Sequence, residues 1–128
     1  MIWKLKTLWR RVKLAWQRVR KGYDDHAVYD FRDDFLYRTA AILEKMKKNL
    51  SSRPYDLTME EWQYIIDRMC TCIKMMDYDY VYDELEKIST PSTGKETVGR
   101  MKESKEIAER HKKEFFKLFE KYFYDLWI

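Results

Sequence analysis

Residues 54–76, PYDLTMEEWQYIIDRMCTCIKMM, contain the clearest helix signal in the chain. Thr58 and Glu61 have the spacing of a capping box, in which each side chain accepts a hydrogen bond from the other residue's backbone N–H. Apolar residues follow this cap at intervals of three and four, as on one side of a helix: Trp62, Ile65, Ile66, Met69, Cys70, Ile73 and Met76. So much apolar surface on one helix predicts that other helices pack against it.

The composition predicts a single all-α domain over residues 1–128, built as an irregular four-helix bundle. Hydrophobic residues make up 45% of the 128 positions, enough for one core, while 3 glycines and 2 prolines allow few turns. Residues 89–97, STPSTGKET, form the longest polar run and are expected to be a mobile loop. The periodic segments predict helices near residues 2–21, 25–50, 59–88 and 98–127. The expected core comprises Trp62, Ile66, Met69, Ile73, Phe35, Ile42, Phe119 and Phe123.

The two cysteines, Cys70 and Cys72, do not predict a disulfide or a shared metal site. Residues two apart on a helix point roughly 200° away from each other. We therefore expect Cys70 in the core and Cys72 as a free thiol, which fits a reducing cytoplasm. No apolar run approaches the ~20 residues of a membrane span, and the charged start does not resemble a signal peptide.

The first 21 residues, MIWKLKTLWRRVKLAWQRVRK, form a basic amphipathic segment without a single acid. It holds eight of the 26 basic residues. The rest of the chain contains the other 18 together with all 22 acidic residues, and therefore carries a charge of −4. Trp3 and Leu14 fall among the charged positions, and Gly22 is suited to end the helix. The apolar side of the predicted helix gathers Ile2, Leu5, Leu8, Trp9, Val12, Ala15, Trp16 and Val19.

This basic helix has four possible interpretations. In the first, the helix belongs to the bundle and its basic side faces solvent. In the other three, it lies on an anionic membrane surface, binds nucleic-acid phosphates, or forms one wall of a site for a small phosphorylated ligand. The acidic aromatic run at 77–84 has two interpretations, either a solvated helix face or a docking surface for the basic helix or its copy in a second subunit.

Catalysis finds little support in the sequence. His26 and His111 are far apart and have no partner at a metal-ligand spacing, and there is neither a glycine-rich phosphate loop nor a nucleophile elbow. The acidic cluster from Asp24 to Asp34 could hold a metal, but the electrostatics of a helix start explain it more simply. We therefore expect no enzymatic activity, no metal and no cofactor.

Three blocks taken together resemble a family of small bacteriophage proteins. The blocks are GYDDHAVYDF at 22–31, Pro54 with LTMEEW at 57–62, and FFKLFEKYFYDLW at 115–127. The family pattern reads G-Y/F-x-D-x-x-V-W-D/N-L-D, P-x-x-L-T-x-E-E-W-x-x-I-L and K-Y-F-x-x-L-W-D. The chain departs from it at three positions, Tyr29, Arg32 and Ile128. The resemblance implies a phage accessory protein in the host bacterial cytoplasm, of the kind that counters host defence.

The favoured function is anti-defence: sequestration of a small anionic molecule, foremost a cyclic nucleotide immune signal. Arginines supply forks for phosphates, and aromatic rings supply stacking surfaces for bases. The predicted ligand-binding residues are Trp3, Arg10, Arg11, Trp16, Arg18 and Tyr23. The main alternative is a protein–protein inhibitor that docks the basic helix onto a host protein. Anionic membrane binding comes third, and a membrane is not the expected partner. The acidic body argues against long nucleic acid, and the many aromatic residues predict a homo-oligomer.

Overall fold

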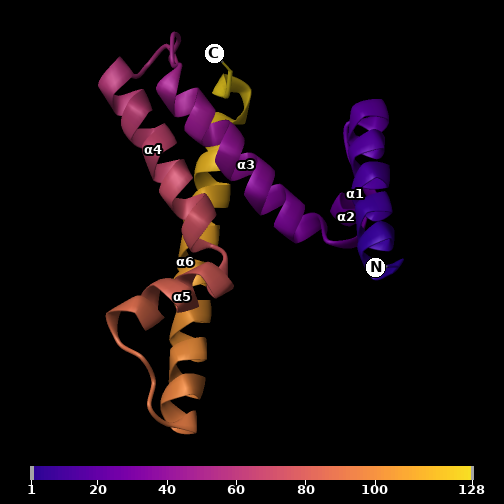
Figure 1. The fold of residues 1–128 in the computed structure, drawn as a ribbon. Helices are drawn as coiled ribbons and strands as arrows, with labels where there is room; N and C mark the ends of the chain where they lie inside the picture. The colour runs from indigo at the N-terminus through magenta and orange to yellow at the C-terminus, as the bar shows by residue number, and fades with distance from the viewer. Residues whose placement is uncertain (1, 128) are drawn as a thin grey trace. The chain divides into compact units, whose positions relative to one another are not determined.

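The computed structural model describes residues 2–127, and every regular element among them is helical (Figure 1). The elements are α1 (Ile2–Lys21), α2 (Asp25–Tyr29), α3 (Phe31–Lys48), α4 (Met59–Met75), α5 (Tyr78–Ile88), α6 (Gly94–Tyr122) and the short 3-10 helix η1 (Phe123–Asp125). The all-α prediction is confirmed. Met1 and Ile128, the ends of the predicted domain, lie outside the described residues.

Six α-helices are described where the sequence predicts four, because aspartates interrupt the second and third expected helices. Asp30 has a non-helical backbone between α2 and α3, and its carboxylate accepts a hydrogen bond from the Asp33 N–H at 3.4 Å. Asp77 lies between α4 and α5, and its side chain accepts from the Asp79 N–H at 3.1 Å. Short acidic side chains compete for backbone N–H groups in this way, which favours a break and a new helix start.

The chain forms two compact units, Met1–Arg38 and Thr39–Ile128. The single domain expected from the sequence stays a prediction. The first unit contains α1, α2 and the beginning of α3. The second unit contains the remainder of α3 together with α4, α5, α6 and η1. Each unit has its own internal contacts and is described by itself below.

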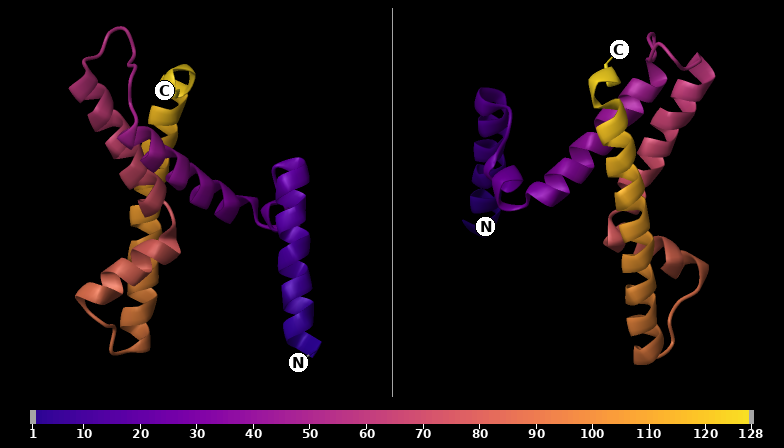
Figure 2. Two further views of the ribbon diagram at one scale, coloured as in Figure 1. Left: turned by 45° about the horizontal axis from the view of Figure 1, so that its top comes forward. Right: turned by 180° about the vertical axis from the view of Figure 1, so that it is seen from behind.

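α6 is the helix around which the second unit packs. α5 lies against its first half and α4 against its second half, as both views in Figure 2 show. Each of these helices contributes apolar side chains to the space between them, so the core is continuous along α6. Its fully buried members are Trp62, Ile66, Met69, Cys72, Ile73, Val81, Ser104 and Phe115.

The start of α4 forms as the sequence predicts. The Thr58 hydroxyl accepts from the Glu61 N–H at 3.1 Å, and the Glu61 carboxylate accepts from the Thr58 N–H at 3.1 Å. The reciprocal pair satisfies two backbone donors that a helix start otherwise leaves open. It also fixes the register that sends Trp62 into the core, where its ring meets the edge of the Tyr122 ring at 5.5 Å.

A polar clamp joins α4 to α6. The Arg68 guanidinium donates two hydrogen bonds to the Glu114 carboxylate, at 2.8 and 2.5 Å, and the Cys72 thiol donates to the same carboxylate at 3.0 Å. These bonds, chiefly those from Arg68, lower the pKa of Glu114 to about 2. Burial, aided by Glu114, raises the pKa of Cys72 to about 12, and burial raises that of Cys70 to about 11. Both thiols are free and both are buried. This confirms the core position expected for Cys70 and the free thiol expected for Cys72, whose burial was not predicted.

The predicted core is right for α4 and partly wrong elsewhere. Ile42 is 57% exposed and Phe123 is 52% exposed, so neither is a core residue. On α3 the buried residue is Leu43, one position later, and a shift of one residue turns a side chain by about 100°. Phe35 and Phe119 are half-buried.

The polar segment after α5 is shorter than predicted. Residues 94–97 of the expected loop 89–97 belong to the first turn of α6. The Thr93 hydroxyl caps this helix by accepting from the Glu96 N–H at 3.1 Å, and the Glu96 carboxylate accepts from the Ser92 N–H at 2.8 Å. Thr93 and Glu96 have the same spacing as the box at the start of α4. Mobility of the remaining residues 89–93 stays a prediction.

Candidate functional site: the basic helix α1

The apolar side of α1 is exposed along its whole length. None of the helix's described residues is buried. An ideal helix turns about 100° per residue, which places the large apolar side chains within an arc of roughly 120°. These side chains are between 50% and 81% exposed: Ile2, Leu5, Leu8, Trp9, Val12, Trp16 and Val19. The predicted amphipathic helix therefore exists, and its apolar face is not buried within the first unit.

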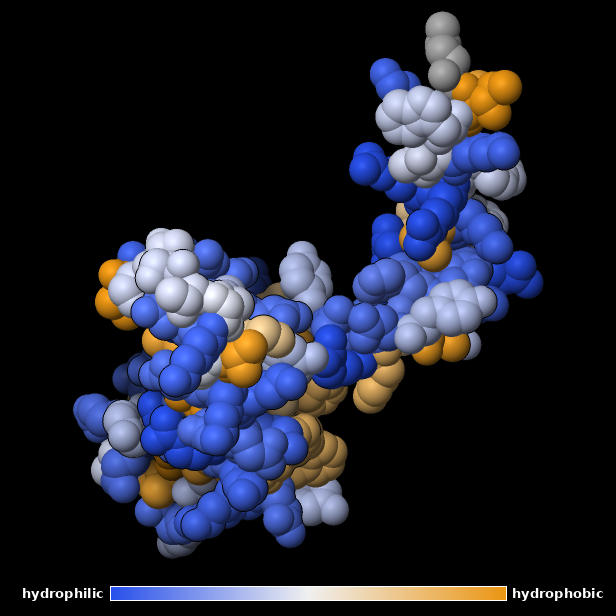
Figure 3. Space-filling view, turned by 90° about the horizontal axis from the view of Figure 1, so that it is seen from below, coloured by the Kyte–Doolittle hydropathy of each residue, from blue (hydrophilic) through white to orange (hydrophobic). Residues whose placement is uncertain are grey.

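Basic residues border this apolar face on both sides. At the same turn angle, Lys4 and Arg11 fall along one border, and Lys6 and Lys13 fall along the other. No acidic residue interrupts either border, because α1 contains none. The space-filling view in Figure 3 shows the resulting kind of surface, in which blue charged side chains stand beside white and orange apolar ones.

The polar side of α1 is attached to α2. The Arg18 guanidinium pairs with the Asp24 carboxylate at 2.5 Å, and the Gln17 side-chain oxygen accepts from the Asp25 N–H at 2.8 Å. Lys13 lies 3.7 Å from the Asp25 carboxylate. Since these contacts use the polar side, the apolar face points away from α2.

The turn between α1 and α2 explains the beginning of the first sequence block. Gly22 has a φ of 82°, a left-handed conformation that favours glycine, and its N–H donates to the Arg18 carbonyl at 2.9 Å. Asp24 then caps α2 by accepting from the Ala27 N–H at 2.9 Å. This bond, followed by the one from Arg18, lowers the pKa of Asp24 and keeps the carboxylate charged. The predicted helix-start role of the acidic cluster is confirmed for Asp24.

The six predicted ligand-binding residues do not converge within one chain. Trp3 stands near one end of α1 and Tyr23 after the other, roughly 30 Å apart along the axis at about 1.5 Å per residue. Trp16 lies on the apolar face, whereas Arg10 lies among the polar positions on another side. Arg18 is already paired with a carboxylate. Trp3, Trp16 and Tyr23 are exposed, at 66%, 64% and 48%, and Arg10 and Arg11 are exposed as well.

A hollow of about 730 Å³ in the first unit is also a poor fit for an anion. Both of its arginines are engaged, Arg18 with Asp24 and Arg38 with Asp34 and the Gly22 carbonyl. Three carboxylates against two arginines leave the lining without a positive excess. The lining residues are Arg18, Gly22, Asp24, His26, Asp33, Asp34, Tyr37 and Arg38.

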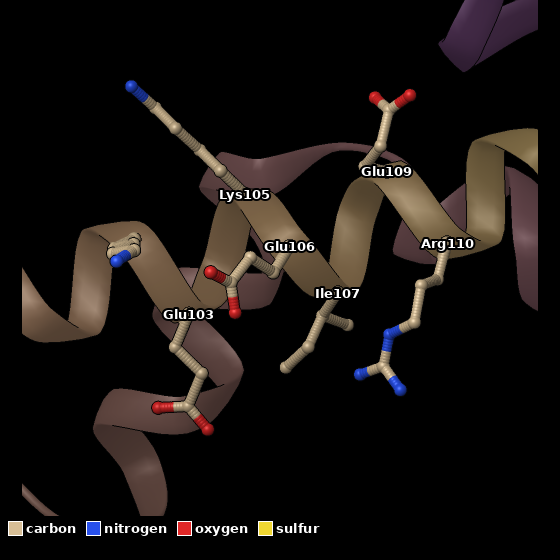
Figure 4. A pocket seen from close by; sticks show the side chains of 7 residues that line it. Glu103, Lys105, Glu106, Ile107, Glu109 and Arg110 are labelled. Atoms are coloured by element: carbon tan, nitrogen blue, oxygen red, sulfur yellow. The ribbon is translucent and has the colours of Figure 1, made fainter.

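Two hollows of the second unit lie on α6. The first is formed by charged side chains around Ile107, and Figure 4 shows them projecting from one helix, with Lys105 and Glu109 on one side and Glu103 and Arg110 on the other. Side chains that leave a single helix in different directions do not enclose a ligand. The second hollow lies between α5 and α6, has a volume of about 230 Å³, and is lined chiefly by tyrosines and a methionine.

Sequence reasoning missed the hollow between α5 and α6. Its signal is the run DYDYVYD at 77–83, which marks an acidic aromatic helix. The sequence does not say which of these tyrosines line a common space with α6, because that depends on the break at Asp77 and on the crossing of the two helices.

Metal and membrane-spanning sites are absent from the part of the chain that the structure describes. No group of three or more His, Cys, Asp or Glu among residues 2–127 is placed to hold a metal ion. None of the helices described there combines the length and the apolar content that crossing a bilayer requires. Comparisons with protein-family models, with curated proteins and with solved structures find no match. The resemblance to phage proteins therefore stays a prediction.

Proposed function

We propose that α1 binds the surface of an anionic membrane, lying in the headgroup plane with its apolar face toward the acyl chains. One observation carries this proposal: seven large apolar side chains are at least half exposed on a helix with eight basic residues and no acid. Basic amphipathic helices with tryptophan on the apolar side characteristically lie in this interface.

The energetic terms favour such binding. Removing one large apolar side chain from water contributes up to about 1.5–3 kcal/mol, and each Lys or Arg near an anionic surface contributes about 1 kcal/mol. The summed free energy from seven apolar and several basic side chains exceeds the free-energy cost of immobilising a helix, even when the side chains are only partly buried. Because α1 is helical and tied to α2 beforehand, less conformational entropy is lost on binding than for an unfolded segment.

The charges that attract the membrane are concentrated in the first half of α1. Lys13 and Arg18 have carboxylate partners in the first unit. Basic residues without an ion-pair partner among the described residues number four in the first half of α1 and two in the second: Lys4, Lys6, Arg10 and Arg11, against Arg20 and Lys21. The first half of the helix is therefore expected to approach an anionic surface first.

The same geometry makes nucleotide sequestration the weaker candidate. Its predicted residues are spread over roughly 30 Å and over different sides of α1, too far apart for one cyclic nucleotide within a single chain. Docking onto a host protein remains the closer rival, since an exposed amphipathic helix also fits a protein groove. The exposed apolar face thus raises membrane binding from third place among the sequence predictions to first.

Flotation of the full chain with lipid vesicles tests the proposal. We expect co-flotation with vesicles that contain phosphatidylglycerol, weaker co-flotation at high salt, and almost none with pure phosphatidylcholine. Val12→Glu, at the centre of the apolar face, should lower the bound fraction at least tenfold. Val98→Glu is the matched control, because it changes another exposed helical valine, outside α1, and should leave binding unchanged.

Two results would contradict membrane binding. One is the absence of the wild-type chain from the floating fraction with anionic vesicles. The other is equal loss of binding in the Val12→Glu and Val98→Glu variants. Calorimetry against cyclic di- and trinucleotides then tests the rival: micromolar binding abolished by Arg10→Glu/Arg11→Glu/Arg18→Glu would restore sequestration as the first candidate.

A further inference from the structure

The hollow between α5 and α6 combines an aromatic interior with an acidic border. Its lining presents aromatic and thioether surface to a space of about 230 Å³. A pocket of this kind suits a flat aromatic side chain, which binds by apolar burial and ring contacts. The lining residues are Tyr78, Asp79, Tyr82, Met101, Ser104 and Lys105.

A row of carboxylates runs along α5 beside the hollow. Asp79, Asp83 and Glu86 are spaced by four and three residues, which places them on one side of the helix. All three are exposed, and none has an ion-pair partner within residues 2–127. Asp79 belongs to both the row and the hollow, so the two features form one surface, which we call the α5 acidic surface.

Lys105 indicates which kind of side chain enters the hollow. Its Nζ lies 5.8 Å from the centre of the Tyr78 ring, in a cation–π arrangement. A second cation at this point would be repelled by the Lys105 ammonium, whereas an indole would not. The hollow therefore fits a tryptophan, and basic residues on the same ligand fit the carboxylates outside it.

α1 carries this combination. Trp9 is 72% exposed and has Lys6 three residues before it and Lys13 four residues after it, on the same side of the helix. Lys6 lies on the border between the apolar and the polar side of α1. The helix of charge +8 and the acidic surface of α5 are therefore complementary in charge as well as in side-chain type.

We infer that the α5 acidic surface binds α1 of a second copy of this chain, with Trp9 in the hollow and basic residues against Asp79, Asp83 and Glu86. Two copies that exchange α1 in this way form two identical contacts and a closed dimer. The exchange covers an exposed apolar face and an unpaired acidic row in each copy. The inference does not rest on membrane binding, and association is measured without lipid.

Two charge-reversal variants test this inference. The acid-reversed chain carries Asp79→Lys, Asp83→Lys and Glu86→Lys. The base-reversed chain carries Lys4→Glu, Lys6→Glu, Arg10→Glu, Arg11→Glu and Arg20→Glu, which together make α1 net acidic, since it has eight basic residues and no acid. Light scattering should give the wild type twice its mass of 15.9 kDa, with dissociation at high salt. Each variant alone should be a monomer, because its α1 and α5 have the same sign. An equimolar mixture should associate again, because each copy then meets a partner of opposite sign.

Trp9→Ser provides a test without charge reversal and should weaken dimerisation at least tenfold. Trp127→Ser is the matched control, because it removes another exposed indole, 61% accessible, that has no role in the proposed contact. Circular dichroism should be equal for both variants. A monomeric wild type, a mixture of the reversed chains that stays monomeric, or equal dimerisation by Trp9→Ser and wild type would each overturn the inference.

Discussion

Trp62 offers the sharpest test of the core of the second unit. Its side chain is fully buried, its ring meets Tyr122 edge-on at 5.5 Å, and its Nε1 has no hydrogen-bond partner among the described residues. The indole therefore contributes apolar burial and also bears the cost of an unpaired N–H. Substitution by Ala and substitution by Phe separate these two effects.

The two substitutions should have very different costs. Trp62→Ala removes the whole ring and leaves a large cavity, which lowers the free energy of unfolding by about 3–5 kcal/mol. Trp62→Phe keeps a ring against Tyr122 and removes the unpaired N–H, whose burial costs about 1–3 kcal/mol. The smaller Phe ring also leaves a cavity, which destabilises the fold and offsets the gain from removing the N–H. The net change in the free energy of unfolding should therefore stay within about 1 kcal/mol.

Urea denaturation of the full chain, followed by far-UV circular dichroism, measures both free energies. The slope of the transition should be similar for all three proteins, so that midpoints can be compared. A cost below about 1 kcal/mol for Trp62→Ala would remove Trp62 from the core. A Trp62→Phe variant as unstable as Trp62→Ala would show that the indole N–H makes a stabilising contact.

Three further outcomes are expected. Thr58→Ala removes the cap of α4 and should lower the free energy of unfolding by about 1 kcal/mol, measured by the same denaturation. Cys70 and Cys72 should react with a maleimide only on unfolding, because both are buried and their pKa values are raised to about 11 and about 12; rapid labelling of the native chain would contradict this. The lowered pKa of Glu114 means that its bond to Arg68 stabilises the fold fully above the ordinary carboxyl pKa of 4.5 and is lost as the pH falls toward about 2. In Glu114→Gln the free energy of unfolding should therefore no longer change with pH through this group. The difference from the wild type should be less than about 1 kcal/mol, because the Arg68 and Glu114 side chains are both over a third exposed.

The sequence predicts α4 well because local and tertiary signals agree there. The Thr58–Glu61 spacing sets the first residue of the helix, and the apolar intervals after it are long enough to set the buried side. Trp62, Ile66 and Met69 are accordingly buried. Where periodicity is weaker, as on α3, the same reasoning chose Ile42 over Leu43 and missed the core by one residue.

The sequence predicts α1 as a helix but not what its apolar face meets. Periodicity reports that a helix has an apolar side, and it does not report whether that side is buried in its own chain. Arg18 illustrates the same gap, because its pairing with Asp24 depends on the turn at Gly22 and removes it from the predicted ligand site. The hollow beside α5 likewise depends on the helix break at Asp77, and no single sequence motif predicts it.

The two proposed uses of α1 exclude each other, because both need its one apolar face. Trp9 is either in the acyl boundary or in the hollow beside α5, so anionic lipid and a second copy must compete. Adding phosphatidylglycerol vesicles to the dimer should release monomers that bind the vesicles one by one, whereas phosphatidylcholine vesicles should leave the dimer intact. The bound fraction should then depend on protein concentration, and the acid-reversed monomer should bind vesicles more tightly than the wild type. Vesicle binding by an intact dimer, detected by cross-linking between copies, would show that the two contacts use different faces of α1.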